Sequence, residues 1–136
     1  MLAVASAVAG RSKDRGTQVG ACVADARGRI VGTGYNGFPK GAPDALLPTS
    51  GKAKHAWTLH AEVNAMLQAI ATAGDVTLPQ GSALYCTHRP CATCVKLAAH
   101  VGVKVVIYSA DELSPGQERE ASLVAKTLSV SVRRRR

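Results

Sequence analysis

After residue 60 the chain alternates between helical patterns and short apolar runs, and this alternation limits the folds that it can adopt. Helical patterns cover residues 60–74, 91–102 and 114–128, and strand-like runs lie between them at 82–88 and 103–110. Strands that are separated by helices need crossover connections, which place the strands parallel in one sheet. The alternation therefore predicts an α/β fold with a largely parallel sheet and helices on both faces.

The first half of the chain has a different pattern. Residues 1–11 are expected to form a short helix, and two apolar runs at 17–25 and 29–37 are joined by a tight turn, which is typical of a β-hairpin. Residues 36–59 are rich in Gly and Pro and show no periodicity. A loop of this length inside a small domain is usually functional or mobile. A last short strand is expected at 129–132.

Length and composition fit one globular domain. The chain has 136 residues, of which 46% are hydrophobic and 19% are charged. We expect one domain at 1–132, followed by a basic tail, Arg133–Arg136. The first ten residues lack a basic leader and are too short to span a bilayer, so we expect a helix there and not a signal peptide. With no other membrane-length apolar run, a cytoplasmic protein without a membrane partner is expected.

The positive charge is partly a property of the chain end. The formal net charge is +8, and the four arginines of the basic tail account for half of it. A run of this kind can bind nucleic acid or another polyanion, but a solvated terminus is the interpretation favoured here. The remaining charge of +4 fits an anionic small substrate.

The four cysteines fall into two groups. Cys22 and Cys86 lie in apolar runs, where we expect them to be small buried core residues. Cys91 and Cys94 have the Cys-x-x-Cys spacing of a metal site or a redox pair. Without a secretory leader, a disulfide framework is not expected.

Side chains with metal-ligand chemistry stand at the starts of two predicted helices. His60 begins one of them, and Cys91 and Cys94 lie three residues apart on one face of the other. Two strand-to-helix turns in adjacent units can bring both helix starts to the same edge of the sheet. One imidazole nitrogen and two thiolates then converge and leave the fourth tetrahedral position of a zinc ion open, and the positive end of each helix dipole favours thiolates there. We therefore predict a zinc site with these ligands.

Glu62 distinguishes a catalytic zinc site from a structural one. Four ligands close a zinc site, whereas three ligands and a nearby carboxylate are typical of catalysis. Zinc lowers the pKa of a bound water towards ~7, and a glutamate can take that proton and deliver it to a leaving group. Two alternatives stay open: a redox pair with an unrelated histidine, and a structural site in which Cys22, Cys86 or His88 supplies a fourth ligand.

These residues carry a resemblance to a known family. His60-Ala61-Glu62 and Pro90-Cys91-Ala92-Thr93-Cys94 match the H-x-E and P-C-x-x-C signature of zinc deaminases. Over residues 3–132, the segments RSKDRGTQVGACVAD, GRIVGTGYNGFPKG, HAEVNAM and HRPCATC resemble the deoxycytidylate (dCMP) deaminases of the zinc-dependent cytidine/deoxycytidylate deaminase family. Gly34-Tyr35-Asn36-Gly37 and Asn64 point to the nucleotide branch of that family.

The resemblance implies a fold and an activity. The fold is the cytidine-deaminase-like three-layer α/β/α sandwich with a mixed, mostly parallel sheet. The activity is the hydrolytic deamination of dCMP to dUMP and ammonia, a step of pyrimidine deoxynucleotide metabolism. The family also implies a homo-oligomer, a hexamer or a dimer, and regulation by dCTP and dTTP is known in it. The segment Leu46–Thr58 is poor in cysteine and aromatic residues, which leaves that regulation open here.

The resemblance also implies roles for particular residues. His60, Cys91 and Cys94 match the zinc ligands and Glu62 the catalytic proton shuttle. The backbone amide of Ala61 resembles the group that fixes the base carbonyl, and Asn36 resembles a deoxyribose contact.

Two departures from the family pattern bear on the metal and the substrate. The stretch KGAPDALLP after the Gly-Tyr-Asn-Gly loop has no cysteine, so we predict one zinc ion per chain. Arg89 stands where an apolar or small residue is commoner, and it could reach a phosphate or alter the base pocket. Lys13 is the preferred cation for a substrate phosphate, with Arg15, Lys40 and Arg89 as weaker candidates.

Three other functions share part of this evidence. A deaminase of tRNA or another nucleic acid has the same zinc motif, and the basic tail gives it some support. It must take its base out of the stack, and aromatics make up only 4% of this chain, so a nucleic-acid partner is not expected. A deaminase of another small heterocycle and a non-catalytic zinc-stabilised interaction module are the remaining alternatives.

Overall fold

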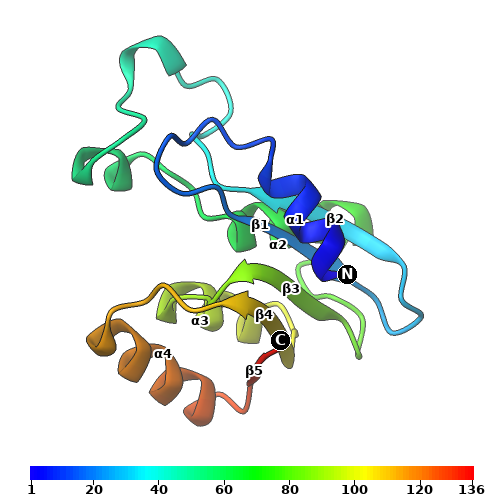
Figure 1. The fold of residues 1–136 in the computed structure, drawn as a ribbon. Helices are drawn as coiled ribbons and strands as arrows, with labels where there is room; N and C mark the ends of the chain where they lie inside the picture. Colours follow the sequence, from blue (N-terminus) through cyan, green and yellow to red (C-terminus); the bar gives the residue numbers. More distant parts are fainter.

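The central sheet has the strand order β2-β1-β3-β4-β5 in the computed structural model, which describes residues 1–136 (Figure 1). β1 (Gly20–Ala24) is antiparallel to both of its neighbours, β2 (Ile30–Tyr35) and β3 (Ala83–His88). β3, β4 (Val105–Ala110) and β5 (Ser131–Arg134) pair in parallel. Because β1 alone is reversed, the other strands all run in one direction. The prediction of a mixed, mostly parallel sheet that begins with a hairpin is confirmed.

Helices cover both faces of this sheet. α1 (Leu2–Ala9) packs on one face, over β1, β2 and β3 (Figure 1). α2 (Ala61–Ala73), α3 (Ala92–His100) and α4 (Pro115–Thr127) contribute to a single buried cluster on the other face. The arrangement is the three-layer sandwich that the sequence resemblance implied. None of the helices has the length and apolar content that crossing a membrane requires.

Glycines in β1 and β2 bring the helices close to the sheet. A Cβ at Gly20 would lie 1.9 Å from the backbone oxygen of Ala5 in α1. On the other face, a Cβ at Gly34 would lie 2.4 Å from the oxygen of Ala61, the first residue of α2. These separations are far below van der Waals contact, so only glycine permits the packing. The start of α2 is therefore held directly against the end of β2.

The core consists of small aliphatic side chains, as the scarcity of aromatic residues predicts. Met66, Leu84, Val95, Val103 and Val106 are among its largest fully buried members. Both Cys22 and Cys86 are also fully buried and free, which confirms their prediction as core residues.

The segment between β2 and α2 is mostly irregular, as predicted. It contains two short 3₁₀ turns, Asp44–Leu46 and Lys52–Ala56, and it projects from one end of the sheet (Figure 1). Its base is closed by paired backbone hydrogen bonds between Gly37 and Leu59, at 3.1 and 2.7 Å. This bridge returns the chain to the sheet immediately before His60.

The four C-terminal arginines are exposed, as expected, but the first two are not frayed. β5 continues through Arg133 and Arg134, because the parallel ladder pairs Arg134 with Tyr108. The Arg134 guanidinium also lies 2.8 Å from a carboxylate oxygen of Asp111. Strand pairing and an acidic partner therefore order residues whose composition alone indicated a frayed end.

Candidate active site

The ligand residues predicted from the sequence stand at the starts of α2 and α3. His60 is the N-cap residue of α2, and Cys91 is the N-cap residue of α3. β2 and β3 run in the same direction, so the segments that leave their carboxyl ends emerge at the same edge of the sheet. This topology brings the two helix starts together, as the strand-to-helix argument predicted.

Three ligand atoms converge at this edge. The Nδ1 atom of His60 lies 3.6 Å from Sγ of Cys91 and 3.4 Å from Sγ of Cys94, and the two sulfurs are 3.6 Å apart. Zinc–sulfur bonds of about 2.3 Å and zinc–nitrogen bonds of about 2.0–2.1 Å give tetrahedral edges of about 3.8 Å between sulfurs and about 3.6 Å between nitrogen and sulfur. The three separations match one face of such a tetrahedron, so the residues fit a zinc ion.

No fourth protein ligand joins this group. His60, Cys91 and Cys94 are the only cluster of His, Cys, Asp or Glu side chains whose ligand atoms lie within 4.8 Å of one another. The proposed fourth ligands of a structural site are elsewhere, since Cys86 is buried in the core and Nε2 of His88 contacts Glu112 at 3.1 Å. A tetrahedral ion here would keep one open position, which is the arrangement of a catalytic site.

Close contact shifts the pKa values of the three side chains in different directions. The hydrogen bond to Cys94 and the bond to His60 lower the pKa of Cys91 to about 3, against the opposing effect of burial. The same hydrogen bond between the two cysteines, together with burial, raises the pKa of Cys94. The bond to Cys91 raises the pKa of His60. The cluster thus holds a thiolate and exchangeable protons, and zinc binding releases protons from such ligands.

Glu62 lies beside the three ligand residues but is not a member of the ligand group. It belongs to the first turn of α2, and only 4% of its surface is exposed. Burial raises the pKa of its carboxyl group to about 7. A carboxyl group with this pKa can accept and return a proton near neutral pH, which is what a general acid–base catalyst requires.

A cavity of about 210 Å³ opens beside these residues. His60, Ala61, Glu62 and Cys91 are among the residues that line it. Asn36 also lines it and is rigidly held, because its Oδ1 accepts a hydrogen bond from the backbone N–H of Val19 at 2.8 Å and its Nδ2 donates to the carbonyl of Thr17 at 2.9 Å. The structure therefore brings Ala61 and Asn36, both predicted as substrate contacts, to the same cavity as the ligand group.

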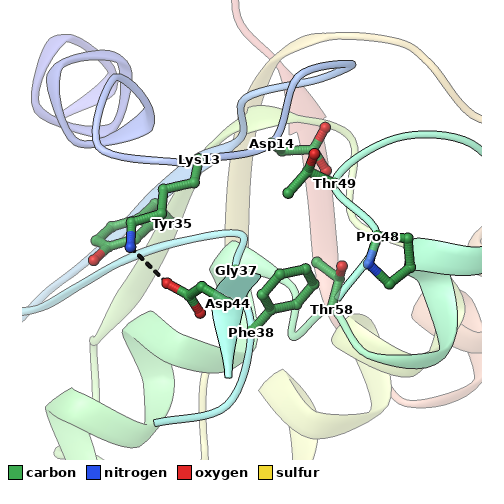
Figure 2. Close-up of a pocket in the computed structure, with 9 residues that line it drawn as sticks. All are labelled: Lys13, Asp14, Tyr35, Gly37, Phe38, Asp44, Pro48, Thr49 and Thr58. Atoms are coloured by element: carbon green, nitrogen blue, oxygen red, sulfur yellow. Dashed lines mark hydrogen bonds and ion pairs between the residues drawn. The ribbon is translucent and has the colours of Figure 1, made fainter. Parts of the chain in front are cut away.

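Lys13 lies in a neighbouring pocket instead. Figure 2 shows this pocket, of about 120 Å³, in which the Lys13 ammonium group forms an ion pair with Asp44 beside Tyr35 and Phe38. The side chain of Lys13 is 78% exposed. Asp14 and Thr58 line both pockets, which therefore adjoin. Lys13 is near the cavity without lining it.

Arg89 lines the cavity, but its guanidinium is already engaged. Nη1 donates to Glu118 at 2.6 Å and Nη2 donates to Ser122 at 2.8 Å, both on α4. A role as a phosphate ligand would require at least part of this network to break.

Lys54 is the cavity residue that the sequence reasoning missed. Its Nζ donates to Oδ1 of Asp14 at 2.8 Å, and the two side chains are only 13% and 7% exposed. Burial alone raises the pKa of Asp14, but the hydrogen bonds from Lys54, Thr17 and Gly16 together lower it. No pattern in the irregular segment marks Lys54, because its position depends on a contact across 40 residues.

Comparisons with known proteins agree with this geometry. The family model for the cytidine and deoxycytidylate deaminase zinc-binding region matches residues 1–110. Mouse deoxycytidylate deaminase is 38% identical over 98% of this chain and 76% of its own length. Human deoxycytidylate deaminase is 39% identical over 89% of this chain and 68% of its own length. The crystal structure of dCMP deaminase from the cyanophage S-TIM5 in complex with dCMP and dUMP has a TM-score of 0.75 and 29% identity, covering 98% of this chain and 93% of that one.

The fold and the His/Cys/Cys site define a zinc-dependent deaminase. More particularly, the chain belongs to the cytidine and deoxycytidylate deaminase family, as the sequence resemblance implied.

Proposed function

We propose that this chain catalyses the zinc-dependent hydrolytic deamination of dCMP to dUMP and ammonia. The observation that carries the proposal is the tetrahedral spacing of His60, Cys91 and Cys94, with the buried Glu62 beside an open fourth position. The names of the mouse and human relatives and the dCMP- and dUMP-bound cyanophage structure support dCMP as the substrate.

Each residue of the site has a role in this reaction. His60, Cys91 and Cys94 would hold a zinc ion, which as a Lewis acid would lower the pKa of a water molecule. Glu62 takes the proton from that water and delivers it to the leaving amino group. The amide of Ala61, in the first turn of α2, has no acceptor within the helix and donates to the base carbonyl. Asn36, which lines the same cavity, contacts the deoxyribose.

We assign the substrate phosphate to the cation-bearing wall of the cavity. Lys54 is the best placed cation, because it lines the cavity and is held by a buried partner. Lys13, the cation preferred from the sequence, becomes a weaker candidate because it lies in the adjoining pocket, and Arg89 stays a weaker one because it is bound to α4. Exchange of Asp14 for a phosphate dianion would give Lys54 a stronger partner.

We further infer that the chain is a homo-oligomer, a hexamer or a dimer, and dCTP and dTTP are the nucleotides to test as regulators. Leu67 on α2 and Ile30 on β2 are 51% and 46% exposed, and contact with a second copy would bury such side chains. Light scattering of the purified protein, with and without each nucleotide, would measure the assembly, and initial rates would measure the regulation. A monomer at all concentrations would contradict the inferred homo-oligomer.

Ammonia release from a set of substrates tests the proposed reaction. We expect dCMP to exceed deoxycytidine in kcat/KM by at least ~10-fold, because a charge-assisted phosphate contact contributes on the order of 1.5–3 kcal/mol. dCTP, guanine and a tRNA anticodon stem serve as the comparison substrates. Equal kcat/KM for deoxycytidine and dCMP would exclude a nucleotide-specific enzyme, while activity on guanine or tRNA alone would favour the alternatives.

Substitution of Lys54 tests the phosphate assignment. Lys54→Met should reduce kcat/KM for dCMP by ~10-fold or more and leave that for deoxycytidine nearly unchanged, because only dCMP carries the phosphate. Lys13→Met is the matched control, since it removes a nearby lysine that does not line the cavity. A larger loss of selectivity for dCMP over deoxycytidine in Lys13→Met than in Lys54→Met would show that Lys13, and not Lys54, contacts the phosphate.

A further inference from the structure

Arg89 stands at the start of the turn that carries the proposed ligand Cys91. Its backbone N–H donates to the carbonyl of Ala110 at 2.8 Å, which extends the β3–β4 ladder by one residue. Pro90, the single residue between them, is fully buried, and its ring fixes the backbone φ angle. Cys91 then begins α3 as its N-cap. Because only the rigid Pro90 separates Arg89 from Cys91, a displacement of Arg89 also displaces the sulfur of Cys91.

The Arg89 side chain is fixed by contacts to two other elements. Nη1 donates to Glu118 at 2.6 Å and Nη2 to Ser122 at 2.8 Å, and these partners lie four residues apart on one face of α4. Nη1 also donates to the hydroxyl group of Tyr108 in β4 at 3.3 Å, and the guanidinium lies 5.6 Å from the centre of that ring. Asp111 is a further anionic neighbour, at 3.8 Å.

The ion pairs around Arg89 continue to β5, the last strand. Asp111 pairs at 2.8 Å with Arg134 of β5, so the turn before α3 is connected to β4, α4 and β5. The planar guanidinium is suited to this position, because it presents donors in several fixed directions at once. A lysine can keep the charge but cannot reach the same set of acceptors.

This network is not an obvious source of global stability. Glu118 and Asp111 are 50% and 40% exposed, so water can solvate them if Arg89 is removed. Nε of Arg89 is buried without an acceptor, which is unfavourable. Apolar replacements of partly buried ion pairs are often neutral in stability. The benefit of the arginine is therefore local, at the turn that it fixes.

We propose that Arg89 is a positioning residue for the metal ligand Cys91. It clamps the Arg89–Cys91 turn between β4 and α4, so that the Cys91 sulfur keeps its separation from His60 and Cys94 and the bound zinc ion is released slowly. The inference rests on the zinc site of the proposed function. In this proposal Arg89 acts through Cys91 and does not contact the substrate.

Zinc release from the zinc-loaded protein tests the proposal. The variants are Arg89→Met, which keeps much of the apolar stem, and Arg89→Lys, which keeps the charge. We expect Arg89→Met to speed zinc transfer to a chromogenic chelator by ~10-fold or more, a typical effect of losing a group that orients a metal ligand. The zinc release rate of Arg89→Lys should lie between the rates of Arg89→Met and the unaltered protein. The ratio of kcat/KM for dCMP to that for deoxycytidine should not change.

Arg134→Met is the control, because it breaks the same network at its far end, in β5. It should leave the zinc release rate unaltered, whatever its effect on Tm. Equal zinc release in Arg89→Met and the unaltered protein would overturn the proposal, as would a selective loss of activity on dCMP. The release assay needs no substrate, so failure of the dCMP assignment would leave its result interpretable.

Discussion

Glu62→Gln retains near-stoichiometric zinc and loses at least ~100-fold in kcat on dCMP, the effect expected when a proton-transfer group is removed. The glutamine amide has the shape of the carboxyl group but cannot accept the proton from water. The metal should stay because the carboxylate of Glu62 is not a member of the ligand group formed by His60, Cys91 and Cys94. The prediction thus separates catalysis from metal binding in one variant.

Metal analysis and single-substrate kinetics on the same preparation measure both quantities. Glu120→Gln is a suitable control, since it makes the same chemical change on the exposed surface of α4. It should keep both the zinc and the turnover. If Glu62→Gln were purified without zinc, the carboxylate would have to be a ligand, and the assignment of its role would be wrong.

Much of the site could be predicted because local sequence determines it. Apolar periodicity, Gly74 and Pro90 mark the helices, and the order of strands and helices places the starts of α2 and α3 at one sheet edge. The spacing of Cys91 and Cys94 within one helix turn then indicates a shared ligand. Residues 60, 62, 91 and 94 follow from these features together with the resemblance to zinc deaminases.

The positions of the cations around the cavity could not be predicted, because long-range contacts determine them. Lys54 reaches the cavity through its pairing with Asp14 and the bridge between Gly37 and Leu59, none of which leaves a periodic pattern. Lys13 has an equally suitable charge but is turned towards Asp44. Arg89 has its partners 19 to 33 residues further along the chain. For these side chains, residue type indicated the chemistry but not the location.

The cysteines provide the second prediction with a large effect. Cys91→Ser and Cys94→Ser should each abolish stoichiometric zinc and with it the deamination of dCMP, because a serine hydroxyl is not ionised at neutral pH and does not replace a thiolate ligand. Loss of the metal also removes its contribution to folding at that edge of the sheet. We expect a lower Tm than that of the unaltered zinc-loaded protein, and a Tm that no longer responds to a chelator.

Cys91→Ser isolates the metal contribution because serine is a preferred N-cap residue and Cys91 occupies the N-cap of α3. The helix start therefore keeps a suitable residue while the ligand is lost. Cys22→Ser and Cys86→Ser are the matched comparisons, since the same change is made in the core. They should keep one zinc ion per chain and most of the activity, with stability reduced by about 1–3 kcal/mol for burying a hydroxyl group. Loss of zinc from Cys86→Ser would contradict the open site, because it would make Cys86 a fourth ligand.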